Sequence, residues 1–153
     1  MTDLWADALA GLPLLLRVPA GARGLVLIAH ADATRQRQPE QGFVADVLHA
    51  NRWATLPFCL HSAAEQAAGL APPGLVQARL RIRAMFDRLS AFREADGLAV
   101  AMVGVGEAVP GCAAAAARHK PARLQALVLL DGRADQVSHH LLRLNVPTLF
   151  VLG

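Results

Sequence analysis

Residues 98–131 read LAVAMVGVGEAVPGCAAAAARHKPARLQALVLLD, and they predict a strand, a glycine turn, a helix and a second strand. Leu98 to Val103 is an uninterrupted apolar run, which is typical of a strand buried on both faces. Gly104, Gly106 and Gly111 mark the turn, because residues without a Cβ allow positive φ or a close approach of two backbones. Ligands bind open parallel sheets at the carboxyl ends of strands, so the sequence predicts that this turn lines the functional site.

Outward from this unit, apolar runs alternate with helical patterns along most of the chain. We expect further strands at residues 14–18, 24–29, 53–60, 127–130 and 148–152, and helices near residues 43–51, 75–92, 112–117 and 137–144. Residues 3–12 fit a short amphipathic helix or an ordered tail, and residues 30–41 and 61–74 are expected to be loops. This order predicts one α/β domain over residues 1–153, a three-layer, doubly wound, mostly parallel sheet of about six strands covered by helices on both faces.

The composition of the 153 residues excludes several classes of function. With 54% hydrophobic residues the chain is expected to fold around a core, and its length suits a single core. Its net charge of +3 comes from scattered basic residues. With 5% aromatic residues and no tyrosine, the chain lacks a platform on which nucleic-acid bases could stack. We therefore expect no nucleic-acid partner.

Residues 97–117 carry one charge over a length that could span a membrane, but Glu107 and Pro110 lie at their centre. A strand, a turn and a helix fit this segment better, and the early acidic residues and proline break any signal-peptide pattern. We therefore expect a cytoplasmic protein with no membrane contact. The cysteines, Cys59 and Cys112, show no CxxC spacing, so we expect small buried hydrophobes, with a reactive Cys112 as the alternative, and no metal or cofactor.

A family resemblance rests on the order, spacing and apolar pattern of four segments. These are GLVLIAHADATRQRQPEQGFVADVLHANRWATLPFCL (24–60), MVGVGEAVPGCAAAAA (102–117), ALVLLDGRAD (126–135) and LNVPTLFVLG (144–153). Together they resemble the α/β-hydrolase superfamily, in particular its dienelactone-hydrolase-like branch. The resemblance implies an α/β-hydrolase fold and, in ordinary members, an esterase whose nucleophile stands in a Gly-x-Ser-x-Gly turn or a cysteine version of it.

The resemblance also implies that the nucleophile is missing. Aligned on the strand, the motif reads Gly104-Val105-Gly106-Glu107-Ala108, and the nucleophile position falls on Gly106. Aligned on the helix, with Gly111 as the last motif glycine, the same position falls on Val109. Neither residue can attack a carbonyl group, so both alignments predict the same loss.

The remaining parts of the family's site depart as well. The family usually has a His-Gly pair beside the oxyanion, whereas this chain has His30-Ala31-Asp32-Ala33, in which Asp32 adds an unfavourable negative charge. The triad acid and base normally follow the last two strands, and Gly153 ends the chain before them. We therefore expect a catalytically inactive protein that acts in binding a small molecule or another protein. Its vestigial site would comprise His30, Ala31, Gly104, Gly106, Glu107 and Cys112.

Two alternatives remain open at this point. A residual ester hydrolase would use Cys112 as an unconventional nucleophile or Glu107 as a buried general base, although a buried thiol and a solvated carboxylate are the commoner roles. A dinucleotide-binding module would use Gly104, Gly106, Gly111 and Asp131 as its phosphate turn and ribose acid. Its glycine spacing is GxGx4G rather than GxGxxG, which ranks it second.

The last expected strand predicts self-association. Residues 148–152 (TLFVL) carry no charge and are expected to lie at a sheet edge. Unpaired N–H and C=O groups at such an edge invite a second chain. We therefore expect a homo-oligomer, most simply a homodimer, with this strand or the helix near residues 137–144 at its interface.

Overall fold

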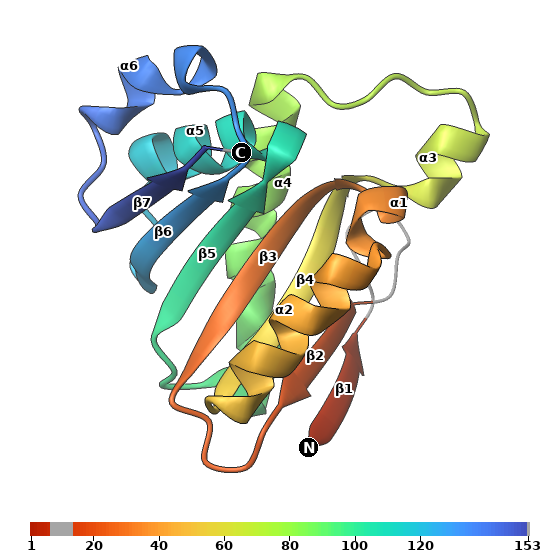
Figure 1. Ribbon diagram of the computed structural model, residues 1–153, viewed down its shortest axis with the longest axis vertical. Coiled ribbons are helices and arrows are strands. Elements are labelled where there is room, and N and C mark those ends of the chain that lie inside the picture. The colour runs from red at the N-terminus through yellow and green to blue at the C-terminus, as the bar shows by residue number, and fades with distance from the viewer. Residues whose placement is uncertain (7–13, 153) are drawn as a thin grey trace.

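The computed structural model describes residues 1–6 and 14–152. Within them, seven strands form one sheet in the order β1-β2-β4-β3-β5-β6-β7 (Figure 1). The strands are β1 (Thr2–Ala6), β2 (Leu14–Val18), β3 (Gly24–Asp32), β4 (Trp53–His61), β5 (Val100–Val105), β6 (Leu124–Leu130) and β7 (Thr148–Val151). Strands β3 to β7 are parallel, and β1 and β2 are antiparallel to their neighbours. The predicted mostly parallel α/β sheet is thus confirmed, with β1 as the additional strand.

Helices lie on both sides of this sheet (Figure 1). On one side are α1 (Ala33–Gln36) and α2 (Pro39–Ala50), and on the other are α4 (Leu75–Arg88), α5 (Val109–His119) and α6 (Ser138–Leu141). Short α3 (Ala63–Ala67) extends beyond the sheet, and 3-10 turns occur at η2 (Leu89–Ala91), η3 (Arg93–Ala95), η4 (Gly106–Ala108) and η5 (Ala134–Gln136). The core fills the space between the sheet and α4 and α5, where Leu27, Leu56, Ile82, Met85 and Met102 are fully buried.

The N-terminal segment forms a strand, and not the short helix that was one of the two expectations for residues 3–12. Thr2 to Ala6 pair with Val18 to Leu14 residue by residue, because an antiparallel partner satisfies their backbone groups. The rest of the expected helix, residues 7–12, lies outside the described residues.

The prediction of a loop at residues 30–41 is largely wrong, because two helices begin within this segment. Strand β3 continues to Asp32, whose carboxylate accepts a hydrogen bond of 2.9 Å from the backbone N–H of Arg35 and so caps α1. Helix α2 begins with Pro39, whose missing N–H costs nothing in the first helical turn.

The loop expected at residues 61–74 also contains a helix, α3. The Ser62 hydroxyl accepts from the backbone N–H of Glu65 at 3.0 Å, and the Glu65 carboxylate accepts from the N–H of Ser62 at 3.1 Å. This reciprocal capping box satisfies two N–H groups that a helix start otherwise leaves free.

Strands β5 and β6 are buried on one face, not on both as the apolar runs predicted. Along β5, fully buried side chains alternate with half-buried ones, and the second half of β6 does the same. The reason is the position of α2, which contacts β4 but makes little contact with β5 or β6. The outer face of these strands therefore has no helix of the described residues above it (Figure 1).

Among the described residues, no helix is both long and apolar enough to cross a membrane. Residues 97–117 form a strand, a 3-10 turn and a helix, as the sequence predicted.

Candidate functional site

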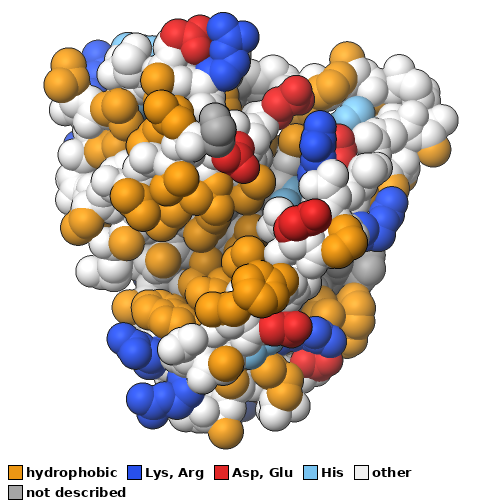
Figure 2. Space-filling view, viewed as in Figure 1, with side chains coloured by type: hydrophobic (Ala, Val, Ile, Leu, Met, Phe, Trp, Pro, Cys, Tyr) orange, Lys and Arg blue, Asp and Glu red, His pale blue; other side chains and the backbone are white. Residues whose placement is uncertain are grey.

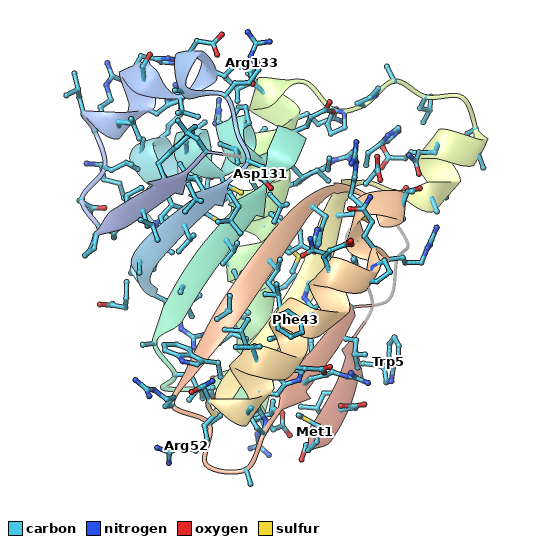
Figure 3. All side chains as sticks on the ribbon, in the orientation of Figure 1. Met1, Trp5, Phe43, Arg52, Asp131 and Arg133 are labelled. Atoms are coloured by element: carbon cyan, nitrogen blue, oxygen red, sulfur yellow. The ribbon has the colours of Figure 1, made fainter. Side chains whose placement is uncertain are left out.

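A cavity of about 930 Å³ opens at the carboxyl ends of β3, β5 and β6, where ligands of open α/β sheets bind. Four stretches of the chain meet there: residues 31–41, 73–78, 105–111 and 131–136. The lining residues are Ala31, Arg35, Gln38, Glu40, Gln41, Pro73, Gly74, Leu75, Ala78, Val105, Gly106, Glu107, Pro110, Gly111, Asp131, Arg133 and Gln136. Figure 3 shows Asp131 at the carboxyl end of β6 and Arg133 beyond it.

Gly106 forms the apex of the turn from β5 to α5. It follows the last residue of β5 directly and has φ +59°, a conformation that residues with side chains rarely adopt. A Cβ built at Gly106 would meet no atom within 4 Å, so a side chain there would project into open space. The apex of the turn is thus Gly106, the residue that the strand-anchored alignment selects, whereas Val109 already lies in helix α5.

The flanking glycines serve packing rather than an open turn. A Cβ at Gly104 would lie 2.8 Å from the Cys112 sulfur, so glycine at this position lets α5 approach β5. A Cβ at Gly111 would lie 3.0 Å from the Cβ of Ala78, so Gly111 allows α5 to pack closely on α4. These contacts leave Gly106 as the residue of the three that combines positive φ with free space.

Cys112 is fully buried beneath the turn and does not line the cavity. Burial raises the pKa of its thiol from 9.0 to about 12, because the apolar surroundings disfavour the charged thiolate. Cys59 is half-buried on β4, and burial followed by the nearby charge of Asp32 raises its pKa as well. Since the thiolate is the nucleophilic form, the geometry gives no support to a reactive Cys112.

His30 is also buried, with 1% of its surface exposed, and does not line the cavity. Burial lowers the pKa of His30 to about 4, and the opposing effect of Asp32 is smaller, so the imidazole is neutral at pH 7. Ala31 does line the cavity. Asp32 caps α1 and is not among the lining residues, so its carboxylate does not face the position expected for an oxyanion.

The carboxylates in the cavity wall are Glu40, Glu107 and Asp131. Glu107 is exposed at the start of η4, as expected for a solvated carboxylate near a helix start. Asp131 has φ +56° at the end of β6, and its backbone N–H donates to the Val151 carbonyl at 2.9 Å. Across the described residues, no group of three His, Cys, Asp or Glu side chains is placed to hold a metal ion.

The sequence did not predict the part of the wall that comes from α1, α2 and the start of α4. Arg35, Gln38 and Gln41 follow β3, and Arg133 and Gln136 follow β6, so all five come soon after strands that end at the cavity. The signal in the sequence that could have identified these five wall residues is that polar residues follow soon after a predicted strand. The contribution of Pro73 and Gly74 depends on tertiary packing and had no signal in the sequence.

The fold is shared with solved structures of hydrolases. A dienelactone hydrolase from Anabaena variabilis matches with TM-score 0.78 and 21% identity over 99% of this chain and 85% of that chain. A cold-adapted esterase from an Arctic intertidal metagenomic library matches with TM-score 0.70 and 15% identity, covering 98% and 70%. Est1E from Butyrivibrio proteoclasticus matches with TM-score 0.63 and 19% identity, covering 85% and 51%. No protein-family model and no curated protein matches the sequence. The chain has an α/β-hydrolase fold like that of dienelactone hydrolases, which confirms the fold that the sequence resemblance implied.

Proposed function

We propose that this chain is an α/β-hydrolase-fold protein that does not hydrolyse esters and acts by binding. One observation carries the proposal. The described residues that line the cavity include no Ser, Thr, Cys, His, Lys or Tyr. A hydrolase of this fold needs a nucleophile at the apex of the strand-to-helix turn and a base beside it, and the apex here is Gly106.

The carboxylates in the wall are poor substitutes for a triad. Glu107 and Asp131 are exposed, and a hydrated carboxylate is a weak nucleophile without an acid to protonate the leaving group. His30, the nearest histidine along β3, is buried and neutral and stands outside the lining. These positions support a cleft that retains the fold's binding site without its chemistry.

The wall favours a polar small molecule as the ligand. Its charged residues have both signs, and three glutamines add uncharged donors and acceptors: Gln38, Gln41 and Gln136. Arg133 pairs with Asp135 at 2.9 Å, but both side chains are exposed, so this pair is easily exchanged for a ligand. The cavity has the size of an ordinary small-molecule site.

The test is hydrolysis of p-nitrophenyl acetate and p-nitrophenyl butyrate by the purified protein. We expect a rate equal to that of the Glu107→Gln variant and no saturation with substrate. Saturable turnover that disappears in Glu107→Gln or in Cys112→Ala would contradict the proposal and support the residual esterase.

The dinucleotide alternative has its own test. We expect NAD and NADP to leave the melting temperature of the protein unchanged, because side chains of the protein already occupy the space beside Gly104 and Gly111. A saturable rise in melting temperature that Asp131→Ala abolishes would support dinucleotide binding instead.

Two further parts of the proposal are location and assembly. We propose a cytoplasmic location, supported by two cysteines that form no disulfide. We also propose a homo-oligomer. Its support is β7, which ends the strand order of the sheet and leaves one backbone edge without a partner among the described strands.

A further inference from the structure

Helices α4 and α5 pack together on the side of the sheet away from α2 (Figure 1), and a hydrogen bond between an arginine and a histidine joins them. The Nη1 atom of Arg79 lies 3.0 Å from the Nε2 atom of His119. A guanidinium group has no acceptor atom, so Arg79 donates and the Nε2 of His119 accepts. The imidazole of His119 is therefore neutral, with its proton on Nδ1. Both side chains are half-buried.

Two further arginines stand beside this pair. Arg83 follows Arg79 by four residues on α4, so the two side chains share one face of the helix. Arg118 precedes His119 in the last turn of α5. Arg83 and Arg118 are exposed, and we call the four residues the arginine cluster. None of them is among the described residues that line the cleft, so the cluster is a separate feature of the molecule.

The arginine cluster has no carboxylate partner in the part of the chain that the structure describes. Three ion pairs occur there, and none includes a residue of the cluster: Arg17–Asp3, Arg81–Glu65 and Arg133–Asp135. The acidic residue of α4, Asp87, follows Arg83 by one turn and forms no ion pair with it. Burial and the charges of the three arginines of the cluster lower the pKa of His119, and no acidic group opposes them. At His49, by contrast, Asp46 opposes the same effects on the pKa.

The ordinary role of basic side chains explains only half of the cluster. Arg118 and His119 lie in the last turn of α5, where positive charge stabilises the C-terminal end of a helix. Arg79 and Arg83 belong to another helix, and α5 does not need them for this purpose. Their guanidinium groups add like charges to the same place, and like charges repel. An anion bound among them would remove this repulsion.

We propose that the arginine cluster binds the phosphate group of a small molecule. Guanidinium N–H donors match the oxygen atoms of phosphate in geometry and charge. Arg79 uses one N–H group on His119 and keeps others for a ligand. The cluster is compact, because its residues come from consecutive turns of α4 and the last turn of α5. It therefore suits one phosphate group better than DNA or an anionic membrane, which need a longer basic surface.

His119 makes the binding depend on pH. The charged groups that act on it are Arg79 and Arg83 from α4 and Arg118 from α5, all positive. A bound dianion adds a negative charge beside them and so raises the pKa of His119. By linkage, the anion binds more tightly as the pH falls and His119 gains its second proton. The protonated ring then donates to the anion instead of accepting from Arg79.

The experiment is an NMR titration of the purified chain with inorganic phosphate at pH 7.5, against sodium chloride at equal ionic strength. We expect saturable changes in the His119 imidazole signals with phosphate and none with chloride. Arg79→Gln and Arg83→Gln should each raise the dissociation constant about 10-fold. Arg83 is exposed, so Arg83→Gln retains the fold even if Arg79→Gln does not. The matched control is Arg88→Gln, an exposed arginine of α4 outside the cluster, which should leave the constant unchanged.

Sulfate tests the pH dependence, because its charge is constant from pH 5 to pH 8. Its dissociation constant should fall toward pH 5 in the wild type and stay level in His119→Gln. Signals that follow ionic strength alone, or an equal effect of Arg88→Gln and Arg83→Gln, would overturn the site and leave a solvated helix face. Sedimentation with vesicles that contain phosphatidic acid, without binding of free phosphate, would overturn the small molecule in favour of a lipid headgroup.

Discussion

The ion pair between Glu65 and Arg81 joins α3 to α4 and holds the connection that supplies one wall of the cleft. The Arg81 guanidinium donates to the two Glu65 carboxylate oxygens at 2.9 and 2.7 Å, and it also donates to the Leu60 carbonyl. Pro73 and Gly74 of the same connection line the cavity. We therefore predict that Glu65→Gln destabilises the protein through this contact.

The size of the expected loss of stability in Glu65→Gln follows from the pKa of Glu65. The hydrogen bonds from Arg81, with those from the Ser62 backbone, lower this pKa from 4.5 to about 2. At about 1.4 kcal/mol per pKa unit, that difference corresponds to roughly 3 kcal/mol of native-state stability. The two side chains keep 20% and 18% of their surface in water, which screens the pair, so we expect Glu65→Gln to lose about 2 kcal/mol at pH 7.

The pH dependence gives the prediction its sign. Because folding lowers the pKa of Glu65, its contribution is complete above pH 4.5 and is lost as the pH falls toward 2. Urea unfolding followed by circular dichroism at one protein concentration measures this for the wild type and Glu65→Gln. The stability gap should be constant from pH 7 to pH 5 and should shrink below pH 4.5.

The control is Glu94→Gln on η3, an exposed carboxylate, which should change the unfolding free energy by less than about 0.5 kcal/mol. A gap for Glu65→Gln that stays the same down to pH 2 would show that ionisation of Glu65 is not its source. A gap no larger than that of the control would show that the pair behaves like an ordinary surface salt bridge.

Three further predictions concern buried groups near the cleft. The Cys112 thiol should not react with Ellman's reagent at pH 8 in the folded protein, because burial raises its pKa to about 12. It should react after the protein is unfolded in guanidinium. Fast reaction of this thiol in the folded state would contradict the prediction. Gly104→Ala should lower the free energy of unfolding, measured in urea, by about 1–3 kcal/mol, because the added Cβ overpacks against Cys112. Adding Cys112→Ala to this variant should recover part of that loss. The control Gly42→Ala, whose added Cβ would meet no atom within 4 Å, should cause no loss. The imidazole of His30 should titrate near pH 4 when followed by NMR. Because its pKa in the folded state lies below the unfolded value of 6.5, the free energy of unfolding should fall by up to about 3 kcal/mol as the pH drops from 6.5 to 4. A titration midpoint near 6.5 would refute its burial as a neutral ring.

The central strands could be predicted because their apolar runs are long and end at turn residues. The runs in 24–29, 53–60 and 148–152 each became a strand at nearly those residues. The N-terminal strand could not be predicted, because β1 is held by pairing with β2 and not by a pattern of its own. Helices α1 and α3 are only a few residues long, so their formation depends on caps and tertiary contacts more than on periodicity.

The half-covered face was beyond sequence reasoning for a different reason. In β5 and β6, valine, alanine and leucine occupy both faces, so the sequence gives the same apolar run whether or not a helix lies above. Only the position of α2 decides which face is buried. The glycine turn was expected to line a functional site. Gly106, Glu107 and Gly111 line the cavity, whereas Gly104 and Cys112 lie beneath it as packing partners.

The cleft and the half-covered face of the sheet share elements (Figure 2). Val105 is on the half-covered face of β5 and also lines the cavity, and Asp131 lines the cavity one residue after Leu130 of the same face. Helix α2 contributes Gln41 to the cavity and carries Phe43, which is 71% exposed, on its surface. If a ligand binds in the proposed cleft and displaces α2, the exposed surface around Phe43 changes with it, because one rigid helix carries both residues.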